Sequence, residues 1–263
     1  MSNVKERVRE IIRPLGLMIK DLGMDPRRVV ALRHFGKYRA QYKMFSQLGG
    51  KVSHRYVVLS DYGQQAGSAM GHYFHQDLLV ASLIFKKNPT RHIDIGSRVD
   101  GFVAHVAAFR KIEVMDIRDL DDIGHENVTF VKADLMESGN AQRSISDSIS
   151  CLHAIEHFGL GRYGDPIDPD GHLKAFRNIL QMLQPGGTLY ISFPIGRSNE
   201  VHFNAHRVFH PKDILGWSGA QDGVKLRRFD YVDDSGHLHQ DVNLEKSVPD
   251  VHFGCGIYTF EKI

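Results

Sequence analysis

The sequence has only two cysteines, Cys151 and Cys255, and a single tryptophan. Two cysteines cannot build a disulfide framework. Cys151 falls inside a predicted buried strand, where a thiol normally behaves as a small apolar side chain. Reduced thiols are the simplest expectation, and they are typical of a cytoplasmic protein.

Long hydrophobic runs are also missing. The longest, at 78–85, is interrupted by Ser82 and falls far short of the roughly 20 residues that cross a bilayer. The N-terminal segment mixes Glu6 and Glu10 with several arginines and has no apolar stretch, so we expect no signal peptide. These absences predict a soluble protein without a membrane span.

A strong charge imbalance is absent as well. The 33 Lys and Arg residues against 31 Asp and Glu leave a formal net charge of +2. A general nucleic-acid binder normally shows a clustered basic excess, so we do not expect nucleic acid as a partner. The basic residues between Arg27 and Lys43 are interleaved with aromatics, and we interpret them as the solvated face of an amphipathic helix.

The pattern of apolar and polar residues changes near residue 70. In the first part, Val4, Val8, Ile11 and Ile12 recur at helical spacing, so 1–70 is predicted to be an α-helical extension or cap. In 71–263 a helix at 72–85 precedes alternating apolar strands and amphipathic helices. Strands are predicted at 92–95, 111–116, 128–134, 148–155, 188–194, 226–232 and 255–263, with helices at 102–109 and 173–183.

This alternation predicts an α/β fold with a doubly wound, mostly parallel, seven-stranded sheet and helices on both faces. The polar stretch at 233–250 is expected to be a loop or lid. In such a sheet, ligands bind beyond the carboxyl ends of the strands at the switch point. Residues that bind a ligand are therefore expected where each predicted strand ends.

Polar residues follow the first four predicted strands. Asp94 ends the first strand, Asp116 the second and Asp134 the third, and His153 stands at the end of the fourth. A lone aspartate at such a place is weak evidence, because Asp commonly begins turns and caps helices. Four polar strand ends in order predict a nucleoside cofactor site.

The turn after the first strand indicates which cofactor. It contains Gly96 and Gly101 but not the G-x-G-x-x-G pattern of dinucleotide sites. A carboxylate at Asp94 would repel a pyrophosphate and suits a ligand with an ammonium group and a sulfonium centre, which favours S-adenosylmethionine over NAD. Asp116 is placed to accept hydrogen bonds from the ribose hydroxyls.

Two further contacts are predicted at the third strand end. Asp134 is placed to accept from the adenine amine, and Leu135 to donate its backbone N–H to a ring nitrogen. Glycines in the first turn would let the backbone approach the methionine portion closely.

From about residue 70 onward the chain resembles the class I S-adenosylmethionine-dependent methyltransferases. The similar segments are HIDIGSRVDG, IEVMD, VKADL, SISCLHAIEH and LQPGGTLYISFP. More narrowly, GHYFHQDL, DIGSRVDGF and FNAHRVF resemble the family labelled domain of unknown function 268, which is methyltransferase-like and often associated with bacterial surface-polysaccharide and sugar-modification genes. The usual first loop, D-x-G-x-G-x-G, differs here at 97–100.

The resemblance implies cofactor contacts at Asp94, Gly96, Asp116 and Asp134 and around His153. The full set of predicted cofactor-binding residues is Asp94, Gly96, Ser97, Gly101, Asp116, Ile117, Asp134, Leu135, His153 and Tyr73.

Methyl transfer to a hydroxyl needs a base, and histidine is the natural candidate. His157, with Glu156 beside it, follows the fourth strand, and His206 follows the fifth; these three are the predicted catalytic residues. The predicted acceptor-binding residues are His75, Asn204 and Arg207, with Arg207 suited to a phosphate of a nucleotide-activated sugar. Helix capping and a structural salt bridge are the alternative interpretations.

Three histidines, His202, His206 and His210, recur at every fourth residue, which would align them on one helix face. Pro211 follows directly, and no carboxylate or cysteine completes the set, so a metal is not predicted.

The predicted function is therefore an S-adenosylmethionine-dependent methyltransferase, most simply one that O-methylates a small or sugar-like acceptor, as in polysaccharide biosynthesis. The alternatives are a non-catalytic binding module with the same fold and an NAD-dependent sugar-modifying enzyme. The oligomeric state stays open.

Overall fold

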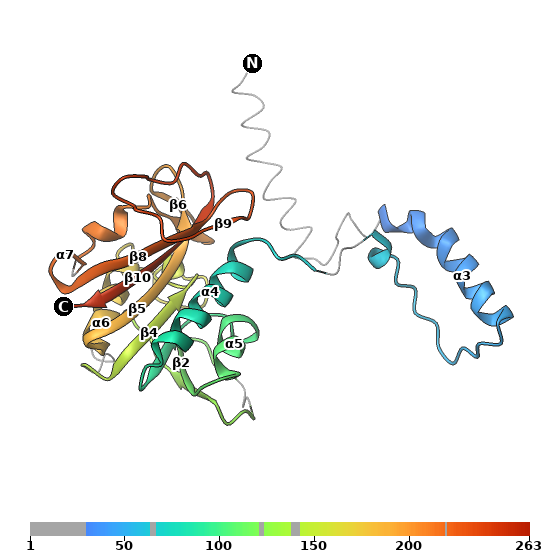
Figure 1. Cartoon of the computed structure of the whole chain (residues 1–263), viewed down its shortest axis with the longest axis horizontal. Helices are drawn as coiled ribbons and strands as arrows, with labels where there is room; N and C mark the ends of the chain where they lie inside the picture. Colours follow the sequence, from blue (N-terminus) through green and yellow to red (C-terminus); the bar gives the residue numbers. More distant parts are fainter. Residues whose placement is uncertain (1–29, 64–66, 121–123, 138–142, 219) are drawn as a thin grey trace, which may run out of the picture. The chain divides into compact units, whose positions relative to one another are not determined.

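The computed structural model describes residues 30–63, 67–120, 124–137, 143–218 and 220–263 (Figure 1). The chain divides into two compact units, Met1–Ser68 and Ala69–Ile263. The helical repeat predicted from Val4 to Ile12 lies outside the described residues.

The first unit contains the 3₁₀ turn η1 (Leu32–His34), the helix α3 (Phe35–Gln47) and the 3₁₀ turn η2 (Ser60–Gly63). The presence of α3 confirms a helix in the N-terminal extension. Basic and aromatic residues of α3 contact the segment that follows the helix: the Lys37 ammonium lies 4.6 Å from the ring centroid of Tyr62. The Arg55 guanidinium lies 3.9 Å from that of Tyr42. These cations therefore stack on aromatic rings within the unit.

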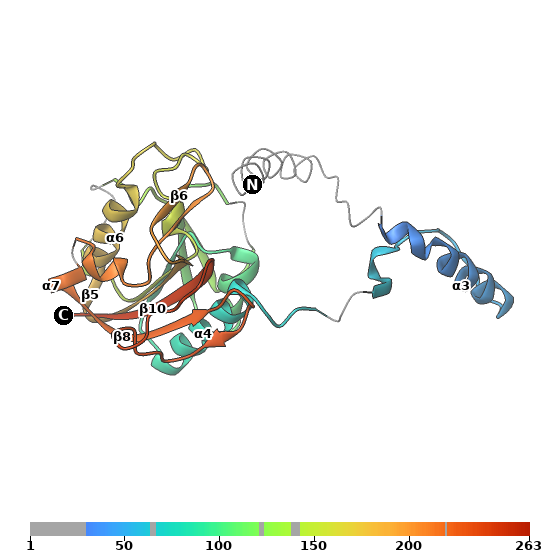
Figure 2. The same cartoon turned by 90° about the horizontal axis from the view of Figure 1, so that it is seen from above.

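The second unit is built on one sheet with the strand order β3-β2-β1-β4-β5-β10-β8-β9. Figure 2 shows two of these neighbours, β10 and β8, side by side. Strands β3 to β5 in this order run parallel, while β10, β8 and β9 pair antiparallel. The strands are β1 (His92–Ile95), β2 (Ile112–Asp116), β3 (Val128–Lys132), β4 (Ser146–Leu152), β5 (Leu183–Ile195), β8 (Val224–Val232), β9 (Leu238–His239) and β10 (Gly254–Lys262). This arrangement confirms the doubly wound, mostly parallel sheet.

Among the described residues the main sheet has eight strands, whereas the sequence predicted seven. The additional strand, β9, lies in the stretch predicted as a loop or lid and pairs Leu238 with Val232 and His239 with Tyr231 at the edge of the sheet. Two residues in a polar segment are too few to show the alternation by which a strand is recognised.

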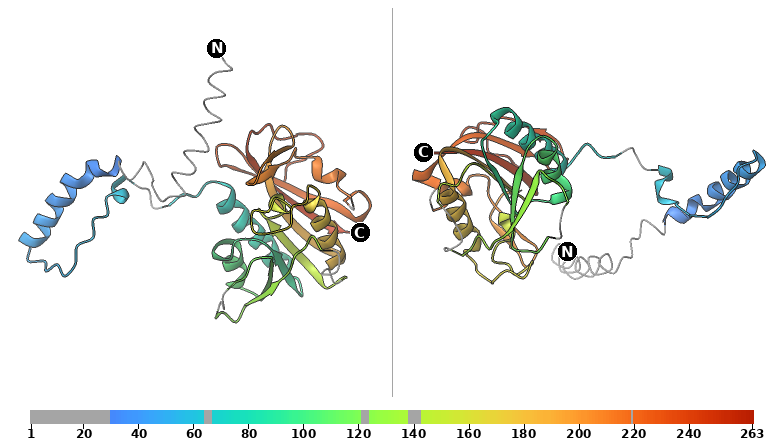
Figure 3. Two further views of the ribbon diagram at one scale, coloured as in Figure 1. Left: turned by 180° about the vertical axis from the view of Figure 1, so that it is seen from behind. Right: turned by 90° about the horizontal axis from the view of Figure 1, so that it is seen from below.

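Helices cover both faces of the sheet (Figure 3). The helix α4 (His72–Lys87), the π-helical turn η3 (Val99–Val103) and α5 (Ala104–Ala107) pack on one face, and α6 (Gly171–Met182) on the other. Short elements complete the unit: η4 (Ile155–His157), η5 (Asp213–Gly216) and α7 (Ala220–Gly223). Helix α4 ends where Asn88 adopts a left-handed conformation, with φ 47°, directly before Pro89.

Each face has its own apolar core. Val80 and Ile84 of α4 pack with Leu152 of β4, whereas Phe176 of α6 packs with Cys151, the preceding residue of the same strand. Successive side chains of a strand point to opposite faces, so a central strand buried on both faces must be apolar throughout, as 149–152 nearly is. Each of these large side chains stabilises the fold by roughly 1.5–3 kcal/mol.

The segment around His202 and His206 is a β-hairpin, not the helix that their spacing suggested. Strand β6 (Glu200–His202) pairs antiparallel with β7 (His206–Val208) as a separate small sheet, and His202 lies opposite His206. His210 lies beyond β7, where its Nδ1 accepts a hydrogen bond from the backbone N–H of Lys212. The predicted helical histidine face therefore does not exist.

Among the described residues no helix is long and apolar enough to cross a membrane.

Candidate functional site

A cleft that is partly open to solvent lies at the carboxyl ends of β1, β2, β3 and β4. The chain switches direction in the sheet between β1 and β4, so the cleft stands at the switch point where ligands of such sheets bind. Its lining residues are Ile95, Gly96, Met115, Asp116, Ile117, Arg118, Ala133, Asp134, Leu135, Met136, His153, Ala154, His157, Phe158, Tyr163 and Asp165.

Six of the ten predicted cofactor residues line this cleft: Gly96, Asp116, Ile117, Asp134, Leu135 and His153. Ser97 lines a second hollow, which shares Asp116 and Arg118 with the first. Asp94, Gly101 and Tyr73 line neither of these two hollows.

Gly96 directly follows β1 and lies in the turn at the end of that strand. Its φ is +68°, and a Cβ at this position would lie 2.9 Å from the Cβ of Ala154. The backbone N–H of Gly96 donates to the carbonyl of Met115 on β2, at 2.9 Å. Only glycine fits this left-handed, crowded position, and the exposed backbone lets a ligand approach closely.

Asp94 holds this turn in place through hydrogen bonds made in the protein interior. The side chain is fully buried, and its oxygens accept hydrogen bonds from the Ser97 backbone N–H at 3.0 Å, the Ser97 hydroxyl at 2.7 Å and the Ser150 hydroxyl at 2.5 Å. Burial raises the pKa of Asp94 to about 6, although these hydrogen bonds oppose the rise. The structure thus places Asp94 as a positioning residue for the loop, not in contact with the cleft.

Asp116 ends β2 with its carboxylate toward Arg118. The Arg118 Nε donates to one carboxylate oxygen at 2.9 Å and its Nη2 to the other at 2.5 Å. The Arg118 guanidinium also lies 4.4 Å from the ring centroid of Tyr163. This arginine is 46% exposed, while Asp116 is 12% exposed. This bidentate ion pair occupies both oxygens of the Asp116 carboxylate, so a ligand can bind there only if Arg118 moves aside.

Asp134 and Leu135 follow β3 along the cleft wall. The Asp134 carboxylate accepts a hydrogen bond from the backbone N–H of Met136 at 2.8 Å. Leu135 is buried, and its carbonyl accepts from Asn178 of α6 at 2.7 Å. The turn that presents Asp134 is thereby tied to the helix beneath it.

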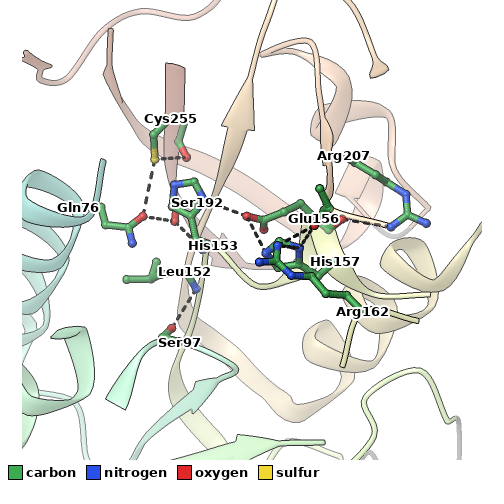
Figure 4. Close-up of polar contacts among 12 residues, drawn as sticks. Gln76, Ser97, Leu152, His153, Glu156, His157, Arg162, Ser192, Arg207 and Cys255 are labelled. Atoms are coloured by element: carbon green, nitrogen blue, oxygen red, sulfur yellow. Dashed lines mark hydrogen bonds and ion pairs between the residues drawn. The ribbon is translucent and has the colours of Figure 1, made fainter. Parts of the chain in front are cut away.

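Glu156 is buried between two histidines in η4 (Figure 4). Its Oε1 lies 2.8 Å from Nδ1 of His153 and 3.7 Å from Nε2 of His157. Burial alone would raise the pKa of Glu156, but the two histidines outweigh burial and lower it. The carboxylate is therefore ionised at neutral pH and lies behind the cleft.

His157 lines the cleft, and its orientation is set by the hairpin β6–β7. Its Nδ1 lies 2.7 Å from the carbonyl oxygen of Ala205, and burial lowers the pKa of His157 below its ordinary value. His206 packs beside it, with ring centroids 6.5 Å apart, but does not line the cleft. Burial lowers the pKa of His206 to about 4.

The predicted acceptor residues lie elsewhere. Arg207 is buried, and its guanidinium donates to the carbonyls of Glu156, Phe158, Asp168 and Pro169, so its N–H groups hold the loop after η4 rather than an acceptor (Figure 4). Asn204 lies in the exposed hairpin turn. His75 packs edge-on against Phe74 on α4. Tyr73, which was predicted to contact the cofactor, packs against His153 with ring centroids 5.1 Å apart and an angle of 42° between the ring planes.

The loop after η4 supplies Tyr163 and Asp165 to the cleft, and neither residue was predicted from the sequence. The Asp165 carboxylate accepts from the backbone N–H groups of Gly159 at 2.8 Å and Gly161 at 3.1 Å. The sequence did contain a signal for this loop, because Gly159, Gly161 and Gly164 follow the fourth predicted strand closely. In the structure all three glycines have positive φ.

The fold and the cleft define a Rossmann-like α/β protein with the architecture of the class I methyltransferases. Residues 107–214 match the model of the family described as "Caenorhabditis protein of unknown function, DUF268". This match confirms the resemblance to that family, over about two fifths of the chain. No curated protein matches the sequence.

Similar folds occur among solved structures. The [4+2]-cyclase SpnF is 16% identical with a TM-score of 0.51, over 83% of this chain and 91% of that one. The N-methyltransferase NodS from Bradyrhizobium japonicum, in complex with S-adenosylhomocysteine, is 11% identical with a TM-score of 0.48, over 73% and 88%. The 1,6-didemethyltoxoflavin-N1-methyltransferase of Burkholderia thailandensis is 15% identical with a TM-score of 0.47, over 71% and 78%. At such identities the likeness concerns the fold alone.

Proposed function

We propose that this protein binds S-adenosylmethionine in the cleft and transfers its methyl group to an oxygen of a small, sugar-like acceptor. The observation that carries the proposal is the charge of the cleft at the switch point. Three aspartates line it, Asp116, Asp134 and Asp165, against two cations: the guanidinium of Arg118 and the imidazole of His153, whose pKa the neighbouring Cys255 and Glu156 raise well above its ordinary value. Such a cleft attracts a cationic nucleoside and repels the pyrophosphate of NAD.

The residues present fit this cofactor. Asp116 would accept from the ribose hydroxyls once Arg118 moves aside, and Asp134 with Leu135 would hold the adenine. The methionine portion would lie against the backbone of Gly96, which lines the cleft. When bound, S-adenosylmethionine supplies an electrophilic methyl group on a positively charged sulfur.

His157 would act as the base. A carbonyl oxygen only accepts, so the Ala205 carbonyl holds the imidazole proton on Nδ1 and leaves the lone pair on Nε2. Nε2 of His157 would accept the proton of the acceptor hydroxyl as that oxygen takes up the methyl group. The ionised Glu156, 3.7 Å from Nε2, stabilises the imidazolium that forms.

The rim of the cleft suits a sugar with an anionic group. Tyr163, which lines the cleft, is 37% exposed, and Phe253 packs beside His206 and is 42% exposed. Such faces stack on the apolar side of a sugar ring. The exposed Arg162 donates to the Ala205 carbonyl at 2.9 Å beside His157, and it takes over the phosphate-binding role that the sequence suggested for Arg207.

Calorimetry with S-adenosylmethionine, S-adenosylhomocysteine and NAD tests the cofactor. We expect both sulfur nucleosides to bind and NAD not to bind; tighter binding of NAD would reject the proposal. Transfer of labelled methyl groups to a panel of nucleotide sugars and free sugars then tests the reaction. Binding of both nucleosides without transfer to any hydroxyl would favour a non-catalytic module instead.

A further inference from the structure

Three side chains from distant parts of the sequence meet beside the cleft: His72 begins α4, His153 follows β4 and Cys255 lies near the start of β10. One ligating atom from each, an imidazole nitrogen or the sulfur, lies within 4.8 Å of both others. We propose that these residues form a Zn²⁺ site with three protein ligands and one open position. The proposal does not depend on the methyltransferase function.

His153 shows the strongest sign of a missing ligand. Its side chain is only 6% exposed, and its Nε2 is buried without a hydrogen-bond partner among the described residues. An unpaired buried nitrogen is costly, and a metal ion would satisfy it. The ring lies between Glu156 and Cys255 (Figure 4), so Nε2 is the nitrogen on the side of the sulfur.

The other ring nitrogen of His153 is placed as in known zinc sites. Nδ1 lies 2.8 Å from the buried carboxylate of Glu156. Histidines that bind metals almost always donate their second N–H to a carboxylate or a carbonyl, which fixes the tautomer and orients the ring. His72 is likewise hydrogen-bonded to the backbone of Phe253.

Cys255 provides the third ligand. Its sulfur is fully buried. It lies 3.7 Å from Oε1 of Gln76 and 3.8 Å from the carbonyl oxygen of Gly256, and it also interacts with the imidazole of His153. The partly exposed His72, stacked on His153 with ring centroids 5.4 Å apart, marks the way in from the surface.

The donor set selects the metal. Two imidazoles and a thiolate suit Zn²⁺, which binds nitrogen at about 2.0–2.1 Å and sulfur at about 2.3 Å. Bringing the three atoms to these distances requires only a modest contraction of the cluster. Zinc sites with three protein ligands keep the fourth position for water or a substrate, and His153 also lines the cleft.

The test uses the full-length, untagged protein after treatment with a chelator. Zn²⁺ is titrated by competition with a chromophoric chelator, and Co²⁺ is added separately as a spectroscopic probe. We expect one equivalent of Zn²⁺ to bind, and Co²⁺ to show the near-ultraviolet charge-transfer band of a thiolate ligand. Failure of the wild-type protein to bind Zn²⁺, or a Co²⁺ spectrum without this band, would overturn the proposal.

Matched variants assign the ligands. Cys255→Ser should abolish the charge-transfer band, whereas Cys151→Ser, at the other buried cysteine, should keep it. His72→Phe preserves ring stacking at a half-buried position, so the variant should fold, and it should weaken Zn²⁺ binding more than about 100-fold; His75→Phe, on the same helix, should not weaken it. Glu156→Gln should weaken binding by about 10–100-fold.

Thermal unfolding of each metal-free variant establishes that it folds. If Cys255→Ser and His72→Phe both bind Zn²⁺ as tightly as the wild type, the proposal is wrong. Loss of binding on replacing His202 alone would place the metal on the hairpin β6–β7 and would also refute it.

Discussion

Nδ1 of His157 lies 2.7 Å from the carbonyl oxygen of Ala205, which stands in the turn between β6 and β7. This contact sets the tautomer of the imidazole, and burial lowers the pKa of His157, so the ring is neutral at pH 7 with its lone pair on Nε2. The hairpin β6–β7 is therefore what orients the proposed base.

Replacing His157 by glutamine should lower kcat for methyl transfer by about 10²–10⁴-fold and leave the affinity for S-adenosylmethionine unchanged. In the wild type, kcat should fall as the pH drops through the lowered pKa of His157, because the protonated ring has no lone pair. Labelled methyl transfer and calorimetry measure the two effects. The exposed His125→Gln is the control, and an unchanged kcat in His157→Gln would exclude this base.

Asp116 and Arg118 should have opposite effects on cofactor binding. Asp116→Asn loses charge-assisted hydrogen bonds to the ribose and should weaken binding by about 10-fold, equivalent to about 1.4 kcal/mol. Arg118→Ala frees the Asp116 carboxylate and should tighten binding several-fold. Arg91→Ala breaks the corresponding pair with Glu113 on the same strand and should change nothing. Weaker binding in Arg118→Ala would mean that Arg118 itself contacts the cofactor.

Asp94 should make the fold less stable as the pH rises. Its folded-state pKa of about 6 exceeds the ordinary value of 3.8. Between these pH values the folded state holds a proton that the unfolded state has released, so the free energy of unfolding falls with rising pH, by about 3 kcal/mol in total from this group. Urea unfolding of the wild type and Asp94→Asn from pH 4 to 7 should show this slope in the wild type alone; parallel curves would contradict it.

Gly96→Ala tests the crowded first turn against a roomier glycine. The new Cβ would adopt φ +68° and lie 2.9 Å from Ala154, whereas Gly164, with φ +82°, has nothing within 4 Å. Both alanines carry a backbone penalty of about 1 kcal/mol, and only Gly96→Ala adds about 1–3 kcal/mol of overpacking. Thermal unfolding measures the stability that each variant loses. Equal losses in the Gly96 and Gly164 variants would mean that the turn around Gly96 admits the Cβ without a free-energy cost. Gly96→Ala should also weaken cofactor binding.

Arg207 should be a stability residue rather than an acceptor ligand. Arg207→Met removes the donor to four backbone carbonyls and should lower the free energy of unfolding by about 3 kcal/mol. The exposed Arg227, paired with Glu261 on the sheet, is the matched control, and its replacement should leave stability nearly unchanged. A loss of acceptor affinity at full stability in Arg207→Met would restore the role suggested by the sequence.

Local sequence patterns were sufficient for the sheet and for part of the cleft. The parallel strands were recognisable because buried strands are short apolar runs bounded by turn residues. Asp116 and Asp134 were recognisable because the carboxyl ends of parallel strands share one edge. The same reasoning placed Asp94 in the cleft, but the structure encloses its oxygens with Ser97 and Ser150. A strand-end position does not reveal which way its side chain points.

The four-residue spacing of His202 and His206 suggested a shared helix face, whereas these residues lie in the hairpin β6–β7. Residues four apart share a face of a helix, but in a hairpin with a three-residue turn they are also cross-strand neighbours, as His202 and His206 are. Long-range pairing, which the local pattern does not contain, selected the hairpin.

The sequence by itself determined the fold class, the strand order along the chain and the acidic edge of the sheet, because hydrophobic periodicity and strand-end residues act over a few positions. Only the tertiary structure decided which side chains face the cleft, which tautomer His157 adopts, and that Cys255 meets His72 and His153. These facts depend on contacts between segments far apart in the chain, which form only when the whole sheet is packed.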